Sequence, residues 1–154
     1  MAGKIDARLK ELGLELPAPN APVANYVPYV VTGNLVFVSG QVSMAGSEKV
    51  MGTVGKDLTV EQGQAAAKLC ALTILAQAKA ACGGDLDRVK RCVKLGGFVA
   101  SGPDFKDHPK VINGASDLLV EVLGDAGRHA RFAVGVPALP LGFAVEIDAV
   151  FEIA

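Results

Sequence analysis

Two runs of alternating side chains close this chain, between Arg131 and Ala154. Large side chains alternate with small or polar ones over 131–136 and again over 143–153, with prolines and glycine between the runs. A period of two is typical of β-strands, and proline and glycine end them. The pattern predicts a β-hairpin in which Arg131 opens the first strand and Glu146 lies early in the second. We expect this hairpin to hold a cation and a carboxylate at neighbouring points of one sheet, an arrangement suited to a small anionic ligand.

The chain has 154 residues, a length typical of one domain with a sizeable core. Its formal net charge is -1 at pH 7. Nucleic-acid-binding domains usually carry a basic face, so this charge balance disfavours nucleic acid as a partner. No apolar run is long enough to span a membrane, and the first residues lack the apolar core of a signal peptide. We therefore expect a cytoplasmic protein that does not insert into membranes.

Three cysteines and two histidines are the candidate metal ligands and thiol nucleophiles. Cys70, Cys82 and Cys92 form no C-x-x-C pair, and no histidine lies close to them in sequence to activate a thiol. They fall in helix and strand patterns, where a free cysteine packs as a small apolar residue. His108 and His129 have no second ligand at metal spacing. The sequence therefore predicts neither a metal site nor a catalytic thiol.

The N-terminal segment differs in pattern from the rest of the chain. Apolar residues recur on one face over residues 5–14, which predicts a short amphipathic helix. The prolines of residues 16–22 exclude helix and favour an extended lead-in. We therefore divide the chain into an N-terminal helix and lead-in, residues 1–22, and a single domain over residues 23–154.

Strands are expected at the start and in the middle of this domain. Residues 26–31 and 35–41 are rich in β-branched and aromatic side chains, with a turn signal between them. A third short extended piece is expected within 44–55. Residues 89–100 predict a further strand, in which the Gly96–Gly97 pair indicates a bulge or a close approach of another group to the backbone.

Two helices separate the strands. A capping box at Thr59–Gln62 begins the first helix, which stops at Gly83, and the second runs from Asp107 to Gly124. With the closing strands, this order predicts an α+β fold with a mixed β-sheet and both helices packed on one face. The strands keep apolar residues on both sides, so the other face needs a partner. We therefore expect a symmetric homo-oligomer.

Three blocks of sequence, in order, resemble the RidA/YjgF family, also called the endoribonuclease L-PSP family. Residues 33–41 read GNLVFVSGQ, which is similar to an early strand of that family. Residues 131–140 resemble its signature R-x-x-V-x-V-x-x-L-P, and residues 145–149, VEIDA, resemble its closing strand. The resemblance covers residues 23–154.

The resemblance implies a chorismate-mutase-like fold assembled as a homotrimer, with ligand clefts between the subunits. RidA-type members hydrolyse reactive enamines and imines, such as 2-aminoacrylate, to a 2-keto acid and ammonia, without a metal or cofactor. Arg131 matches the arginine that holds the substrate carboxylate, and Glu146 matches the acid that places or activates water. Tyr26, with Tyr29 close by, matches a tyrosine that lines the cleft. Ala133 matches a residue that contributes a backbone group.

The chain departs from the pattern of active family members at three positions. Ala133 stands where a cysteine or hydroxyl residue is common, Gly135 where an acid is common, and Pro103 where an asparagine is common. Such changes would reshape the cleft, so they bear on the substrate and on the deaminase activity itself. His129 lies two residues before Arg131, either in a turn or on the strand face that lines the cleft.

Other interpretations of these residues stay open at this point. Without the motif, Arg131 is interpreted as a solvated residue at a strand end or as an ion-pair partner. Glu146, Asp148 and Glu152 share one face of a strand and are then interpreted as a solvent-exposed stripe. Three functions are compatible with the sequence: an enamine/imine deaminase, a non-catalytic trimeric binder or sensor of small carboxylates, and a ribonuclease. The last rests on the family's older label, and the charge balance disfavours it.

Overall fold

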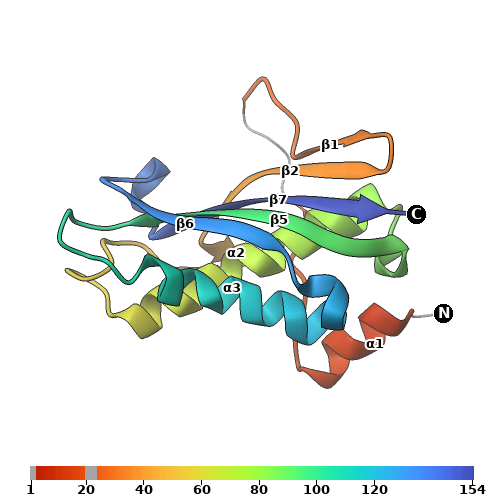
Figure 1. The fold of residues 1–154 in the computed structure, drawn as a ribbon, viewed down its shortest axis with the longest axis horizontal. Helices are drawn as coiled ribbons and strands as arrows, with labels where there is room; N and C mark the ends of the chain where they lie inside the picture. Colours follow the sequence, from red (N-terminus) through yellow and green to blue (C-terminus); the bar gives the residue numbers. More distant parts are fainter. Residues whose placement is uncertain (1–2, 20–23) are drawn as a thin grey trace.

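The computed structural model describes residues 3–19 and 24–154, and it contains a mixed sheet with two long helices on one face (Figure 1). The helices are α1 (Lys4–Glu11), α2 (Val60–Ala81) and α3 (His108–Leu123). The strands are β1 (Tyr29–Thr32), β2 (Leu35–Val42), β3 (Met44–Ala45), β4 (Glu48–Lys49), β5 (Val89–Ala100), β6 (Ala130–Val136) and β7 (Val145–Ile153). Short 3-10 turns lie at Leu86–Arg88, Gly124–Gly127 and Pro140–Gly142. The predicted α+β fold is confirmed.

The main sheet has five strands in the order β1-β2-β7-β5-β6. Only β5 and β6 run parallel, and the other neighbours are antiparallel. The predicted closing hairpin is therefore wrong, because β5 lies between β6 and β7. Alternation identifies a strand, but it does not identify the neighbour of that strand. Here α3 carries the chain from β5 to a parallel β6 at the sheet edge, and the turn at Pro140–Gly142 returns it to the other side of β5.

The two long helices begin and end close to the predicted residues. The Thr59 hydroxyl accepts the Gln62 N–H and the Gln62 side chain accepts the Thr59 N–H, so the capping box is confirmed. Gly124 follows α3 with a φ of 65°, a conformation that favours glycine. The helices pack closely at Gly114, where any Cβ would collide with the backbone carbonyl of Gln64 in α2. Glycine is therefore required at that crossing.

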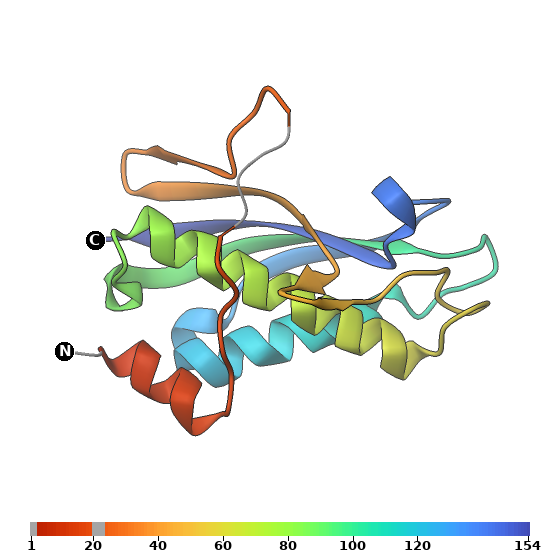
Figure 2. The ribbon, with the colours of Figure 1, turned by 180° about the vertical axis from the view of Figure 1, so that it is seen from behind.

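The core lies between these helices and one face of the sheet. Along β7 the helix-facing residues are all buried: Val145, Ile147, Ala149, Phe151 and Ile153. The residues between them face the other way, and Figure 2 shows the helical layer from behind. The strand at 89–100 is confirmed, but its bulges lie near Arg91 and Val93 rather than at the glycines. The glycines instead allow close approach of other side chains: the Phe132 ring lies against Gly96, and the Ile112 side chain lies against Gly97.

The N-terminal helix α1 is shorter than predicted and is capped by a distant residue. The Asp87 carboxylate accepts the backbone N–H groups of Lys4 and Ile5, each at 2.9 Å. Leu9 of the same helix is buried in the core. Of the predicted lead-in, residues 20–22 lie outside the described residues, and residues 16–19 form neither helix nor strand.

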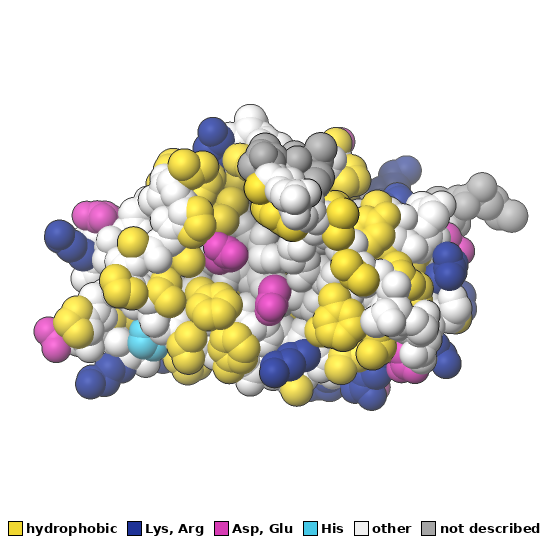
Figure 3. Space-filling view, turned by 90° about the horizontal axis from the view of Figure 1, so that it is seen from above, with side chains coloured by type: hydrophobic (Ala, Val, Ile, Leu, Met, Phe, Trp, Pro, Cys, Tyr) yellow, Lys and Arg dark blue, Asp and Glu magenta, His cyan; other side chains and the backbone are white. Residues whose placement is uncertain are grey.

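The face of the sheet away from the helices is open and largely apolar. Figure 3 looks onto it and shows hydrophobic side chains around acidic side chains in the middle of the face. Phe37 and Val30, paired across β1 and β2, are 44% and 51% exposed. Phe132 is 37% exposed and meets Phe98 edge-to-face at 5.4 Å between ring centroids. Two helices thus cover one face only, as the sequence predicted.

Candidate functional site

Arg131 lies on the edge strand β6, with its side chain on the helix side of the sheet. Its Nη1 donates to the Ser116 hydroxyl at 3.0 Å, and its Nη2 donates to the Pro109 carbonyl at 3.2 Å. Both acceptors belong to α3, and the arginine side chain is half-buried. A guanidinium has five N–H donors. These two bonds fix its orientation and leave further donors for a ligand.

His129 contacts Ser116, the residue that binds the Arg131 guanidinium. His129 Nδ1 lies 2.7 Å from the Gly127 carbonyl, so this nitrogen carries the proton and donates. Its Nε2 then accepts the Ser116 hydroxyl proton at 2.9 Å. Burial holds the pKa of His129 below its ordinary value; the hydrogen bond to the Gly127 carbonyl partly opposes this shift, and the charge of Arg131 adds to it. His129 lies outside β6, in the short link between the 3-10 turn at Gly124–Gly127 and that strand, and its ring contacts Ser116, which also binds Arg131.

Glu146 lies on the open face of the sheet, opposite to Arg131. Its neighbours Val145 and Ile147 are fully buried under the helices, so alternation turns Glu146 outward. Its carboxylate rests against Gly40, within a bulge of β2, where any Cβ would collide with it. Partial burial, followed by the charge of Asp148, raises the pKa of Glu146. The bulge and its glycine thus make room for a half-buried acid.

One chain does not bring the predicted cation and acid together. Arg131 is aligned with Leu95 of β5, and Glu146 is aligned with Phe98, three positions further along the same strand. Leu95 is fully buried under the helices, which marks the face that Arg131 shares. The expectation of neighbouring charges in a hairpin is therefore wrong, because the two strands are separated by β5 and the side chains leave from opposite faces.

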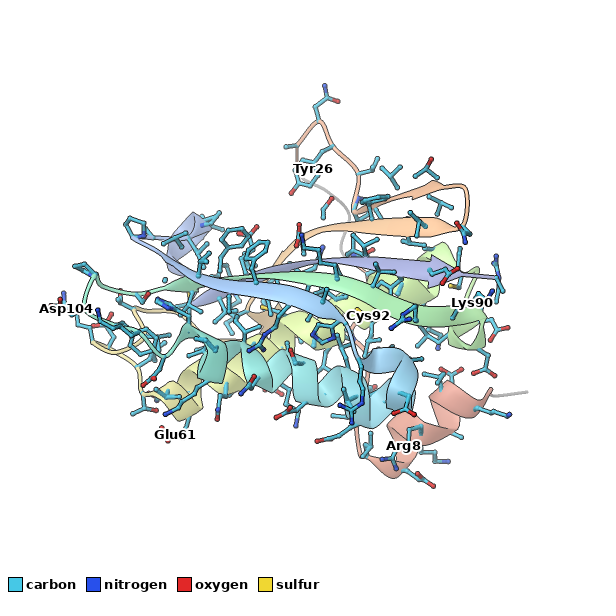
Figure 4. The ribbon with its side chains drawn as sticks, viewed as in Figure 1. Arg8, Tyr26, Glu61, Lys90, Cys92 and Asp104 are labelled. Carbon is cyan, nitrogen blue, oxygen red and sulfur yellow. The ribbon has the colours of Figure 1, made fainter. Side chains whose placement is uncertain are left out.

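Tyr26 and Ala133 lie in different settings. Tyr26 is 56% exposed on the loop before β1, above the open face of the sheet (Figure 4). The strand begins at Tyr29 rather than at Tyr26, so the tyrosine is carried by a projecting loop. Ala133 follows Arg131 on the helix side of β6 and packs against the core. It offers no side-chain proton donor or acceptor beside the arginine.

A further pair of polar side chains, Ser101 and His108, lies near β6 and the start of α3. This pair was not predicted from the sequence. Ser101 Oγ and His108 Nε2 are 3.2 Å apart. Both atoms lie directly over Gly135, where any side chain would collide with them. The His108 ring also meets Phe105 edge-to-face at 5.2 Å. The glycine that departs from the family pattern is thus covered by a serine–histidine pair.

The cysteines have a structural role. Cys70, Cys82 and Cys92 are buried and unpaired. Burial raises the pKa of the Cys92 thiol to about 12 and raises that of Cys70 as well. Such thiols stay protonated near neutral pH, so they are poor nucleophiles. Their interpretation as packing residues is confirmed.

Two hollows lie away from the predicted site residues. A cavity of about 720 Å³ is lined by the segment after α1, the β3–β4 turn and α2, with Leu14, Lys68 and Leu72 among its walls. A smaller one of about 270 Å³ lies beside Met51 and Gln62. Neither includes Arg131 or Glu146. Within residues 3–19 and 24–154 no helix is long and apolar enough to cross a membrane. The same residues bring together no group of three or more potential metal ligands.

A mixed five-stranded sheet with two long helices on one face defines the chorismate-mutase-like class of α+β folds. Residues 6–152 match the family described as "YjgF/chorismate mutase-like, putative endoribonuclease". The chain therefore belongs to the RidA/YjgF family, as its three sequence blocks predicted.

Individual relatives agree with this assignment. Protein TCP17 of Trypanosoma cruzi is 52% identical over 99% of this chain and 96% of its own length. The crystal structure of Atu1372, a protein of unknown function from Agrobacterium tumefaciens, is 54% identical and covers 97% of this chain and 92% of its own, with a TM-score of 0.91. RidA from the Antarctic bacterium Psychrobacter is 31% identical over 88% of this chain and 94% of its own, with a TM-score of 0.60.

Proposed function

We propose that the protein hydrolyses reactive enamines and imines of small 2-amino acids to 2-keto acids and ammonia. The reaction takes place in clefts between the subunits of a homotrimer, and Arg131 holds the substrate carboxylate. The family membership supports this proposal, and so does the name of its Psychrobacter relative, RidA. The single observation that carries it is the fixed guanidinium of Arg131 on an edge strand.

The setting of Arg131 suits a carboxylate ligand. Ser116 and the Pro109 carbonyl orient the guanidinium without neutralising its charge, because neither partner is an acid. Among the ion pairs of the described residues, none includes Arg131. A guanidinium that keeps its charge and has free N–H groups binds a carboxylate through two parallel hydrogen bonds. The arginine is thus oriented to bind an anion that the described residues do not provide.

The placement of Glu146 supports a site shared by two subunits. Glu146 lies on the open apolar face, whereas Arg131 lies at the sheet edge on the helix side. An open apolar face favours association with a second copy of the chain. In the proposed trimer, the edge strand of one subunit meets the open face of the next. Arg131 and Glu146 then line one cleft from two chains, with Tyr26 and the Ala133 backbone completing its walls.

The proposed chemistry needs water and proton transfer only. 2-Aminoacrylate gains a proton at its methylene carbon and loses one from nitrogen, which gives the imine. Water adds across the C=N bond, with its oxygen bonding to carbon and one of its protons going to nitrogen. The second proton then moves from the new hydroxyl to nitrogen, and the C–N bond breaks as the C=O bond forms. The products are pyruvate and ammonia. A carboxylate with a raised pKa, such as that of Glu146, is a stronger base than an ordinary carboxylate and can give and take these protons.

The test is the release of keto acid and ammonia from 2-aminoacrylate generated in the assay. Wild type is expected to accelerate the release over the buffer rate, and Arg131→Ala is expected to lose at least about a hundredfold in kcat/KM. Arg128→Ala is the matched control, because Arg128 is an exposed arginine that pairs with Asp125 nearby in sequence. A wild-type rate equal to the buffer rate contradicts the proposed activity.

A carboxylate binder without turnover is the second candidate, and one observation favours it. The residues that follow Arg131 on its face, Ala133 and Gly135, carry no acid or base. Such a protein would be stabilised by pyruvate in a saturable way, and Arg131→Ala would abolish the stabilisation. Binding with no keto acid release from 2-aminoacrylate would favour this candidate over the enzyme.

A further inference from the structure

A chain of hydrogen bonds runs from the arginine into the protein. Arg131 Nη1 donates to Ser116 Oγ at 3.0 Å, Ser116 lies 2.9 Å from His129 Nε2, and His129 Nδ1 lies 2.7 Å from the Gly127 carbonyl. The three side chains come from different parts of the chain: Arg131 from β6, Ser116 from α3 and His129 from the segment just before β6. The arginine is therefore connected to backbone outside its own strand.

The directions of these bonds are set by the groups at the two ends. A guanidinium only donates, and a backbone carbonyl only accepts. His129 must therefore donate from Nδ1, which leaves Nε2 as an acceptor in the neutral ring. Ser116 accepts from Arg131 and donates its own proton to Nε2. One arrangement of protons satisfies every member, and it requires neutral His129.

We propose that Ser116 and His129 are positioning residues that hold Arg131 in the orientation that receives the ligand carboxylate. This inference rests on the proposed function, because it deepens the role of the same arginine. An arginine side chain loses much rotational freedom when it is immobilised. A guanidinium already fixed by Ser116 loses less of it on binding, so the ligand binds more tightly.

Protonation of His129 disturbs this arrangement. An imidazolium donates from both nitrogens, so it cannot accept the Ser116 proton, and it places a second positive charge near Arg131. Charged groups of both signs lie around His129. β5 contributes Arg91, which donates to the Arg128 carbonyl, whereas the ammonium of Lys94 lies over the Phe132 ring on the open face of the sheet. The charged groups of the remaining elements are Arg128, which is paired with Asp125 in the preceding turn, and the exposed Asp117 of α3.

The first measurement needs no ligand. The NMR signal of the Arg131 Nε–H group is expected to show a side chain restricted on the ps–ns timescale in wild type. Ser116→Ala and His129→Ala are expected to release it, and Ser116→Thr, which keeps a hydroxyl, to restore it. Ser47→Ala, in the exposed β3–β4 turn, is the control. Equal mobility of Arg131 in wild type and Ser116→Ala overturns the inference, whatever the activity of the protein.

The second measurement follows the affinity for pyruvate against pH, with the melting temperature as a check on folding. Ser116→Ala is expected to weaken binding about 5- to 30-fold, with a smaller change in kcat than in KM. Wild-type affinity is expected to fall as His129 becomes protonated. His129→Gln, whose amide oxygen can accept from Ser116, is expected to retain tight binding and lose that pH dependence.

These measurements distinguish failure of the proposed function from failure of the positioning role. A restricted Arg131 in a protein that binds no pyruvate contradicts the proposed function and leaves the positioning role in place. Tight pyruvate binding with equal affinity in wild type, Ser116→Ala and His129→Ala contradicts the positioning role and leaves the proposed function in place. Affinity that rises as the pH falls also overturns the inference.

Discussion

Arg131 and Glu146 lie on opposite faces of one sheet, on strands that β5 separates. In a single chain the arginine points toward α3, and the acid points toward the open face, where Gly40 makes room for it. Two groups placed in this way cannot act on one small molecule within one subunit. An assembly that brings a β6 edge against an open face resolves the difficulty.

The open face gives a prediction about assembly. Phe37→Glu places a charge in the exposed apolar surface of β2, and burial of an unpaired charge is unfavourable. We expect this variant to shift the protein from oligomer toward monomer in analytical ultracentrifugation. Ser47→Glu adds the same charge in the exposed β3–β4 turn and is expected to leave assembly unchanged. A Phe37→Glu protein that sediments like wild type would show that this face is not the interface.

The crossing of α2 and α3 gives a prediction about stability. A Cβ at Gly114 would collide with the Gln64 backbone, which cannot move without displacing α2. Gly114→Ala is expected to lower the free energy of unfolding by about 1–3 kcal/mol, as overpacking does. Gly102→Ala is the matched control, because a Cβ there would meet nothing within 4 Å and the φ of Gly102 is not positive. Urea unfolding measures both, and equal midpoints would contradict the close crossing.

Asp87 gives a prediction about the N-terminal helix. Its carboxylate caps α1 through the N–H groups of Lys4 and Ile5, which also hold its pKa below the ordinary value. Asp87→Ala is expected to loosen α1 and to speed protease cleavage near it, while the rest of the chain stays folded. The same loosening is expected in wild type as the pH falls through the lowered pKa. Asp104→Ala, on an exposed loop, is the control. Unchanged cleavage in Asp87→Ala would contradict the capping role.

Glu146 gives a prediction about pH. Burial and Asp148 raise its pKa above 4.5, so the folded protein binds a proton more tightly than the unfolded chain does. The stability gained from this proton is complete below pH 4.5 and is lost as the pH rises through the folded pKa. Glu146→Gln lacks this dependence. Urea midpoints of the two proteins across that range are expected to diverge with rising pH in favour of the glutamine variant, and parallel curves would contradict a raised pKa.

The sequence predicted the local elements well, because their signals are local. The capping box at Thr59 and the strand over 89–100 depend on residues next to one another, and both are present. The pairing of β6 with β5 depends on where α3 places the chain, which alternation does not encode. The hairpin prediction failed for that reason. The capping of α1 by Asp87 could not be predicted from the sequence either, since its partners lie more than eighty residues away.

The residues of the candidate site were also predictable only where their signal is local in the sequence. The motif marks Arg131 and Glu146 as candidates, because a family signature specifies residue types along the chain, and their role stays a prediction. It did not identify Ser116, which reaches the arginine from α3, or the pair of Ser101 and His108 over Gly135. His129 carried a signal, its position two residues before Arg131. Its role became visible only from its contact with Ser116.

The most direct test of a shared cleft is activity in mixed assemblies of two inactive variants. Arg131→Ala and Glu146→Gln are each expected to be inactive alone. If they are unfolded and refolded together in equal amounts, about three quarters of the trimers contain both variants, and each of those has one intact cleft. About a quarter of the wild-type keto acid release is therefore expected to return. Activity that stays at the level of the separate variants, while wild type recovers through the same treatment, would contradict a site built from two subunits.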